Sequence, residues 1–173
     1  MPLFGRGTPE SVRSRLVRGE RVLAHAPVSE RAGGDRTLTA TTHALYLPDG
    51  HRVVWSDIDR ADWSTDAMTF VEEGAGRRSV PLRVPDSPGG AVDYRRLAET
   101  VSERVTSTIL INSFVPYPEE GSSSGFRLVA RRSPGGTDVH WRVHLSEGLD
   151  AEDPRLSDSV SRSLATLREQ MGV

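Results

Sequence analysis

Five basic side chains in the last third of the sequence have the clearest potential for chemistry: Arg127, Arg131, His140, Arg142 and His144. Arginine presents a planar set of N–H donors that fits phosphate and carboxylate groups, and histidine gains charge as the pH falls from about 8 to 5. Together these residues could bind RNA or another anionic ligand. The alternative is a solvated outer face whose like charges discourage pairing with other strands.

The two histidines of this set, His140 and His144, lie four residues apart, a spacing that on a helix is typical of a metal pair. On a strand they share a face but stand about 13 Å apart at ~3.3 Å per residue, too far for one ion bound at about 2 Å by each. The chain has no cysteine, which excludes disulfide bonds, thiolate metal sites and thiol nucleophiles. We therefore predict no metal site and no cofactor.

A serine-rich segment, Gly121-Ser122-Ser123-Ser124-Gly125, matches the G-x-S-x-G pattern of a nucleophile elbow. That motif needs a buried strand before the serine and a helix after it. Here residues 116–120 are not a buried strand, and the residues that follow favour a strand. The pattern therefore predicts a flexible connector. The sequence contains no assembled triad, metal set or phosphate-binding loop, and we predict that the protein is not an enzyme.

Two acidic runs, at 57–66 and 147–153, lack the spacing of a calcium-binding loop. We expect both to be solvated loops, with Asp153 capping a helix that begins at Pro154. All 22 basic residues are arginine and the formal net charge is −2, a balance unlike that of most nucleic-acid binders. No stretch is apolar and long enough for a signal peptide or a membrane span, so we expect a cytoplasmic protein.

The first part of the chain must supply a scaffold for these residues, and its pattern changes from helix to strands and back to helix. A short helix is predicted over 9–18, with Thr8 as its cap and Pro9 at its first position. Brief apolar runs with turns between them then predict an antiparallel sandwich or barrel. Its expected strands cover residues 21–28, 37–41, 44–48, 52–55, 68–73 and 78–84.

Asp49-Gly50 lies between two apolar runs and predicts a two-residue hairpin turn. Such a turn pairs Tyr46 with Val53 and Ala44 with Trp55 and places all four on the core face. A helix over 92–107 follows, because its apolar residues recur at helical spacing. We expect this helix to pack into the core made by Tyr46, Val53 and Trp55 through Tyr94, Leu97, Val101 and Val105.

The last part of the chain predicts three strands and a helix. The strands are expected over 108–115, 126–132 and 138–145. A turn centred on Gly135-Gly136 pairs Phe126 with Leu145, Leu128 with Val143 and Ala130 with Trp141 on one face. The final helix has an apolar stripe that needs such a face, made of Leu156, Val160, Leu164, Leu167 and Met171. Packing there turns the five basic residues away from the helix.

Three short motifs suggest a family. They are Gly19-Glu20-Arg21-Val22-Leu23, the segment from Thr41 to Tyr46, and the segment from Val54 to Ala61. On these residues the sequence resembles the bacterial pleckstrin-homology-like (PH-like) domains over residues 20–107, and the whole chain resembles uncharacterised proteins of high-G+C bacteria. The resemblance implies a bent sheet closed by helix 92–107, in a family that binds rather than catalyses.

These observations predict an α+β fold, namely an antiparallel PH-like sandwich or barrel closed by a helix, with an appended βββα unit. The expected domains are an arm with a short helix at 1–19, the PH-like domain at 20–107, and a βββα extension at 108–173 packed on it. The favoured function is a non-catalytic cytoplasmic interaction or scaffold protein with a protein partner. The alternatives are a binder of RNA or an anionic ligand, using the basic face of the ribbon at 126–145, and an enzyme.

Overall fold

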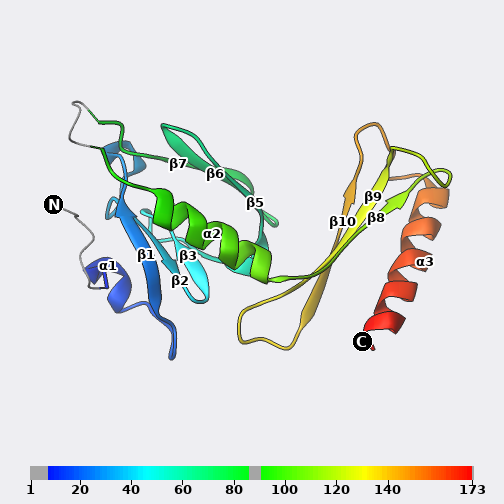
Figure 1. Cartoon of the computed structure of the whole chain (residues 1–173), viewed down its shortest axis with the longest axis horizontal. Helices are drawn as coiled ribbons and strands as arrows, with labels where there is room; N and C mark the ends of the chain where they lie inside the picture. Colours follow the sequence, from blue (N-terminus) through cyan, green and yellow to red (C-terminus); the bar gives the residue numbers. More distant parts are fainter. Residues whose placement is uncertain (1–7, 86–90, 173) are drawn as a thin grey trace. The chain divides into compact units, whose positions relative to one another are not determined.

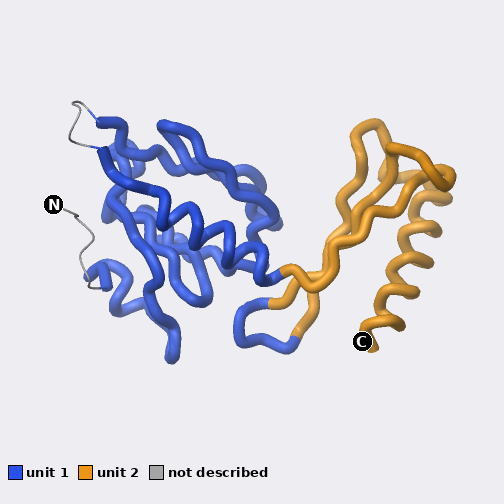
Figure 2. Tube along the Cα trace, in the orientation of Figure 1, with its two compact units in different colours: residues 1–108, 133–137 blue, residues 109–132, 138–173 orange. Residues whose placement is uncertain are grey.

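The protein has an α+β fold of three antiparallel sheets and associated helices (Figure 1). The structure, a computed structural model, describes residues 8–85 and 91–172. Residues 1–7 of the predicted N-terminal arm lie outside this range. The chain divides into two compact units, of which unit 1 comprises residues 1–108 and 133–137 and unit 2 comprises residues 109–132 and 138–173 (Figure 2).

Unit 1 contains two sheets. The first has the order β1 (Val22–Pro27), β2 (Thr37–Thr41), β3 (Ala44–Tyr46) and β4 (Arg52–Val54). The second has the order β5 (Ile58–Trp63), β6 (Ala67–Glu72) and β7 (Gly76–Pro81). Six of these strands match the sequence prediction to within three residues at each end. The described strands form two separate sheets rather than a closed barrel, so the barrel expectation is not met.

Strand β5 was not predicted, because its sequence Ile-Asp-Arg-Ala-Asp-Trp looks like part of an acidic loop. Asp59 and Asp62 therefore lie on a strand and not in the solvated loop expected from the acidic run. A bulge between Ile58 and Arg60 breaks the simple alternation, so the inward residues Ile58 and Ala61 are three apart. Because of the bulge and the charged residues, β5 lacks the alternation of apolar and polar residues by which a strand is predicted from sequence.

The hairpin between β3 and β4 differs from its prediction by one residue. Tyr46 pairs with Arg52, and Leu45 pairs with Val53. Leu47 donates its N–H to the carbonyl oxygen of His51 at 2.9 Å, and Gly50 adopts φ 90°. The loop therefore has three residues with glycine in the left-handed position, a common hairpin type. Because a one-residue change of register exchanges the two faces of a strand, the predicted placement of Tyr46 and Ala44 in the main core is wrong.

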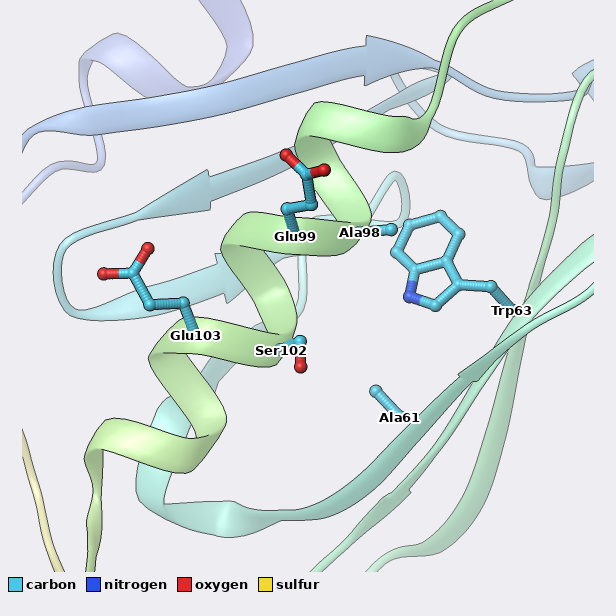
Figure 3. A pocket seen from close by; sticks show the side chains of 6 residues that line it. All are labelled: Ala61, Trp63, Ala98, Glu99, Ser102 and Glu103. Carbon is cyan, nitrogen blue, oxygen red and sulfur yellow. The ribbon is translucent and has the colours of Figure 1, made fainter.

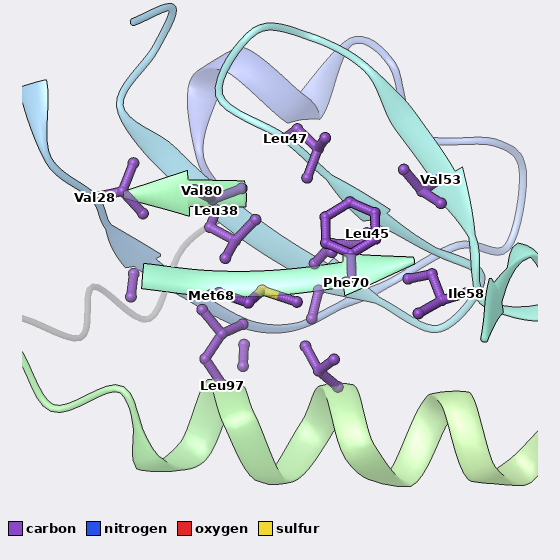
Figure 4. Packing of buried hydrophobic residues seen from close by; sticks show 14 of the residues in the cluster. Val28, Leu38, Leu45, Leu47, Val53, Ile58, Met68, Phe70, Val80 and Leu97 are labelled. Atoms are coloured by element: carbon purple, nitrogen blue, oxygen red, sulfur yellow. The ribbon is translucent and has the colours of Figure 1, made fainter. Parts of the chain in front are cut away.

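Helix α2 (Arg95–Ser107) covers the core of unit 1, as predicted for the helix at 92–107. It buries Leu97, Val101 and Val105 in a cluster that includes Val53 and Trp55 and draws residues from both sheets. Figure 4 shows Leu97 pointing from α2 toward the strand of Met68 and Phe70. The two sheets and α2 therefore share one core.

The N-terminal segment covers the other face of the first sheet. Helix α1 (Glu10–Arg13) is shorter than predicted and begins after Pro9, with no side-chain cap from Thr8. Val12 is buried in a small cluster with Ala44 and Tyr46, and Leu16 packs against that cluster. These contacts attach the segment to the sheet.

Unit 2 is a three-stranded sheet with one helix packed on it. Its strands are β8 (Ile109–Pro116), β9 (Gly125–Arg132) and β10 (Val139–Leu145), with β9 in the centre. The predicted register of β9 and β10 is confirmed, since Phe126 pairs with Leu145, Leu128 with Val143 and Ala130 with Trp141.

Helix α3 (Pro154–Met171) packs on the sheet of unit 2. Its side chains Leu156, Val160, Leu164 and Leu167 pack with Phe126, Leu128, Trp141 and Leu145, as predicted. Met171 and Val143, which were predicted to take part, are not in this cluster, and Val143 is 41% exposed. Asp153 caps the helix by accepting a hydrogen bond from the backbone N–H of Arg155, which confirms its predicted role. In the described ranges, no helix combines the length and the apolar character needed to cross a membrane.

Candidate functional site

An open groove of about 560 Å³ runs between α2 and β5 in unit 1. Its lining residues come from both elements: Ala61 and Trp63 from β5, and Ala98, Glu99, Ser102 and Glu103 from α2. Figure 3 shows Ala61 and Trp63 pointing from β5 toward the helix. The sequence did not predict this groove, because β5, which forms one side of it, was not predicted.

The floor of the groove is apolar and held in place. Trp63 lies against Tyr94, with ring centroids 6.3 Å apart. The Tyr94 hydroxyl donates a hydrogen bond to the Pro27 carbonyl oxygen at 2.7 Å and accepts one from the Arg83 N–H at 2.9 Å. Because Tyr94 is fixed at both sides of its hydroxyl, it limits the movement of the indole ring. Trp63 is thus a preformed apolar surface.

Two glutamates lie at the α2 rim of the groove, and Figure 3 shows their carboxylates pointing away from Trp63 and Ala61. Glu99 and Glu103 are one helical turn apart, and their side chains are 64% and 69% exposed. Each pairs with an arginine of the same helix, Glu99 with Arg95 at 3.0 Å and Glu103 with Arg104. Exposed ion pairs of this kind contribute only about 0–1 kcal/mol. The Glu99–Arg95 pair is exposed on both sides, so a positively charged ligand group can replace Arg95 at low cost.

Strand β5 offers unpaired backbone groups beside this surface, because among the described strands it is one of the two outer strands of its sheet, the other being β7. The N–H of Ser64 donates to the carbonyl oxygen of Ala67, which makes these two residues a hydrogen-bonded pair. Hydrogen-bonded and non-hydrogen-bonded pairs alternate in an antiparallel ladder. Trp63 and Ala61 therefore belong to non-hydrogen-bonded pairs, and their N–H and C=O groups point away from β6. Another strand could pair with them.

The five basic residues singled out in the sequence lie on the outer face of the unit 2 sheet. Their register with the α3-facing residues places all of them on the face opposite that helix. Arg127, His140 and His144 are exposed. Arg131 and Arg142 are only 3% and 7% exposed, and both take part in interactions. The exposed basic face is therefore smaller than predicted, and its role in binding stays a prediction.

Arg127 contacts two side chains of the neighbouring strand β8. Its Nη1 donates a hydrogen bond to Oδ1 of Asn112 at 2.8 Å, and its guanidinium lies 5.6 Å from the centre of the Phe114 ring. Both partners belong to β8, which the sequence analysis did not connect with the basic ribbon. Phe114 is 39% exposed, so an aromatic surface adjoins the basic one.

A buried carboxylate in unit 1 has a structural role. The side chain of Glu20 is fully buried and accepts hydrogen bonds from the Val17 N–H, the Thr41 hydroxyl and the Tyr46 hydroxyl. Burial alone raises the pKa of Glu20. The hydrogen bonds from Thr41 and Val17 and the charge of Arg52 outweigh burial, so the pKa lies below its usual value. Nothing in the motif Gly-Glu-Arg-Val indicates this burial.

A second carboxylate, Glu72, joins His51 and Arg78. The Nε2 atom of His51 lies 2.8 Å from one Glu72 oxygen, and Nε of Arg78 donates to the other. Burial alone raises the pKa of Glu72, but the hydrogen bonds from His51 and Arg78 outweigh it and the pKa is lowered. Both oxygens are occupied within the protein, so this cluster links the β3–β4 loop to β6 and β7 rather than forming a reactive site.

The segment Gly121–Gly125 connects β8 to β9, and the Tyr117 N–H donates to the carbonyl oxygen of Ser124. Because a strand and not a helix follows Ser123, the context of a nucleophile elbow is absent. Nowhere in 8–85 or 91–172 do three His, Asp or Glu side chains gather closely enough to hold a metal ion.

Comparison with protein family models, curated proteins and solved structures gives no match for this chain. The resemblance to PH-like domains therefore stays a prediction.

Proposed function

We propose that the chain is a non-catalytic interaction protein that binds an extended segment of a protein partner in the groove between α2 and β5. The observation behind this proposal is that apolar side chains and unpaired backbone groups occur together at one edge. Ala61 and Trp63 provide both. Addition of a peptide strand to such an edge is a common mode of recognition, in which backbone hydrogen bonds provide affinity and side-chain pockets provide specificity.

The chemistry of the groove defines the segment that it fits. Alternate side chains of an added strand point to opposite faces, so every second residue would meet the apolar surface of Ala61, Trp63 and Ala98. Glu99 and Glu103 favour a partner with lysine or arginine among its other residues. The expected ligand is an extended peptide in which apolar and basic residues alternate. The resemblance to a family of binding domains agrees with this assignment.

Selection from a random peptide library displayed on phage, with the full chain as target, tests the proposal. We expect the selected peptides to alternate apolar and basic residues. Binding should protect the amide N–H groups of Ala61 and Trp63 from hydrogen exchange, because those groups would donate to the peptide. The double variant Glu99→Gln, Glu103→Gln should weaken binding about tenfold or more, since two charge-assisted contacts are lost.

The matched control is Glu119→Gln, Glu120→Gln, which removes the same charge from exposed residues of unit 2. It should leave peptide binding unchanged. Peptides that bind without protecting Ala61 and Trp63, or that tolerate Ala98→Arg, would show that the groove is not the binding site.

A further inference from the structure

Charge is strongly segregated within unit 2. The strands β8, β9 and β10 contain no aspartate or glutamate, whereas they contain four arginines and two histidines. Every acidic residue of this unit lies in a connecting loop or on α3. The chain as a whole has a net charge of −2, but the strands of this sheet contain no negatively charged side chain.

One row of residues crosses the outer face of this sheet. Phe114 of β8 pairs with Arg127 of β9, and Arg127 pairs with His144 of β10. All three side chains are exposed. Neighbouring strands are about 4.8 Å apart, so the row spans roughly 10 Å. An aromatic ring, a guanidinium group over it and an imidazole thus lie in one row on an accessible surface.

We propose that this row binds single-stranded nucleic acid. Bases of a single strand are free to stack on an aromatic ring or a guanidinium plane, and such stacking tolerates any base. Arg127 and His144 supply donors for the phosphate next to the stacked base. The hydrogen bond from Arg127 to Asn112 holds the guanidinium over Phe114 before the ligand arrives. A double helix would not fit this mode, because its bases are already stacked inside the duplex.

This proposal is independent of the peptide groove, since its residues belong to unit 2 and those of the groove belong to unit 1. It uses only the exposed row and needs no contribution from the buried Arg131 and Arg142.

Fluorescence anisotropy of labelled oligo(U) and oligo(dT), titrated with the full chain, tests the proposal. We expect saturable binding at low salt that weakens as the salt concentration rises. Phe114→Leu keeps an apolar side chain but removes the ring, and it should lower the affinity about tenfold because one stacking contact is lost. Arg127→Gln should have an effect of at least this size, since it removes both a cation and the second stacking surface.

The control variant is Arg168→Gln, which removes the same charge from an exposed position on α3 and should leave the affinity unchanged. Tighter binding of oligo(U) than of oligo(dT) would indicate that the protein also contacts the ribose 2′-hydroxyl. Two results would overturn the proposal. One is the absence of any anisotropy change at low salt. The other is binding that Phe114→Leu leaves unchanged and that inorganic polyphosphate abolishes, which would show unspecific attraction of anions.

Discussion

Replacing Glu20 with glutamine tests whether a buried ion, and not only apolar packing, holds the N-terminal segment on the first sheet. The substitution keeps the shape of the side chain but removes its charge. In the native protein one oxygen accepts from Val17 and Tyr46 and the other accepts from Thr41. Glutamine has a single acceptor oxygen, so its amide nitrogen must face one of these donors.

The expected cost follows from these contacts. A hydrogen bond to a charged group contributes about 1.5–3 kcal/mol, and Glu20→Gln loses at least one of them. We therefore expect the free energy of unfolding to fall by about 1.5–3 kcal/mol at pH 7. Glu20→Ala leaves the Val17 N–H without its acceptor and removes the carboxylate that pairs with Arg52, so the loss should reach about 3–5 kcal/mol. Urea unfolding followed by tryptophan fluorescence measures both values.

The pH dependence of the stability provides a second test of the role of Glu20. The pKa of Glu20 is lower in the folded protein than in the unfolded chain, so its ionisation adds stability above the usual glutamate pKa of about 4.3. That contribution is lost as the pH falls through the lowered folded-state pKa. Glu72 behaves in the same way but is present in both proteins. The stability difference between native and Glu20→Gln protein should therefore shrink in acid.

Two results would refute this reasoning. One is a loss of less than about 0.5 kcal/mol for Glu20→Gln at pH 7, which is the size of an ordinary surface substitution. The other is a difference in stability that stays constant from neutral pH to acid. The exposed Glu119→Gln serves as the control and should change neither quantity.

Three further predictions concern packing and the serine-rich connector. Val101→Asp should lower the melting temperature strongly and cost several kcal/mol, because Val101 of α2 is fully buried in the core and the charge would have no partner. Gly125→Ala should destabilise unit 2, since a Cβ at this position would overlap the carbonyl oxygen of Val115, and calorimetry would reveal the loss. Ser123→Ala should leave stability and binding unchanged, whereas stoichiometric labelling of Ser123 by a fluorophosphonate probe would contradict its role as part of a connector.

Unit 2 shows what the sequence predicts well. The register of β9 and β10 followed from three apolar pairs around a Gly-Gly turn, and the stripe of α3 followed from helical spacing. Both are local patterns. Burial of Arg131 and Arg142 was not predicted, because alternation shows which face a residue lies on and not what covers that face. A variant that replaces Arg131 and Arg142 together with Arg127 would therefore disturb the fold, so Arg127→Gln alone is the suitable test of binding.

The groove shows what the sequence does not reveal. Its floor depends on β5, which a bulge and two outward aspartates conceal, and on a helix that follows β5 only after two further strands. No local pattern relates Trp63 to Ala98. Only the packing of α2 against the second sheet brings them together.

The position of the N-terminal segment depends on the β3–β4 hairpin, and in particular on the loop residue Gly50. A two-residue turn would direct Tyr46 into the main core, whereas the three-residue loop ending at Gly50 turns it to the opposite face. There its ring contacts the guanidinium groups of Arg15 and Arg52, and its hydroxyl donates to Glu20. The buried position of Val12 depends on the same face. The conformation of Gly50 therefore determines which residues meet the N-terminal segment, and the ionised Glu20 has its hydrogen-bond donors because the hairpin takes this register.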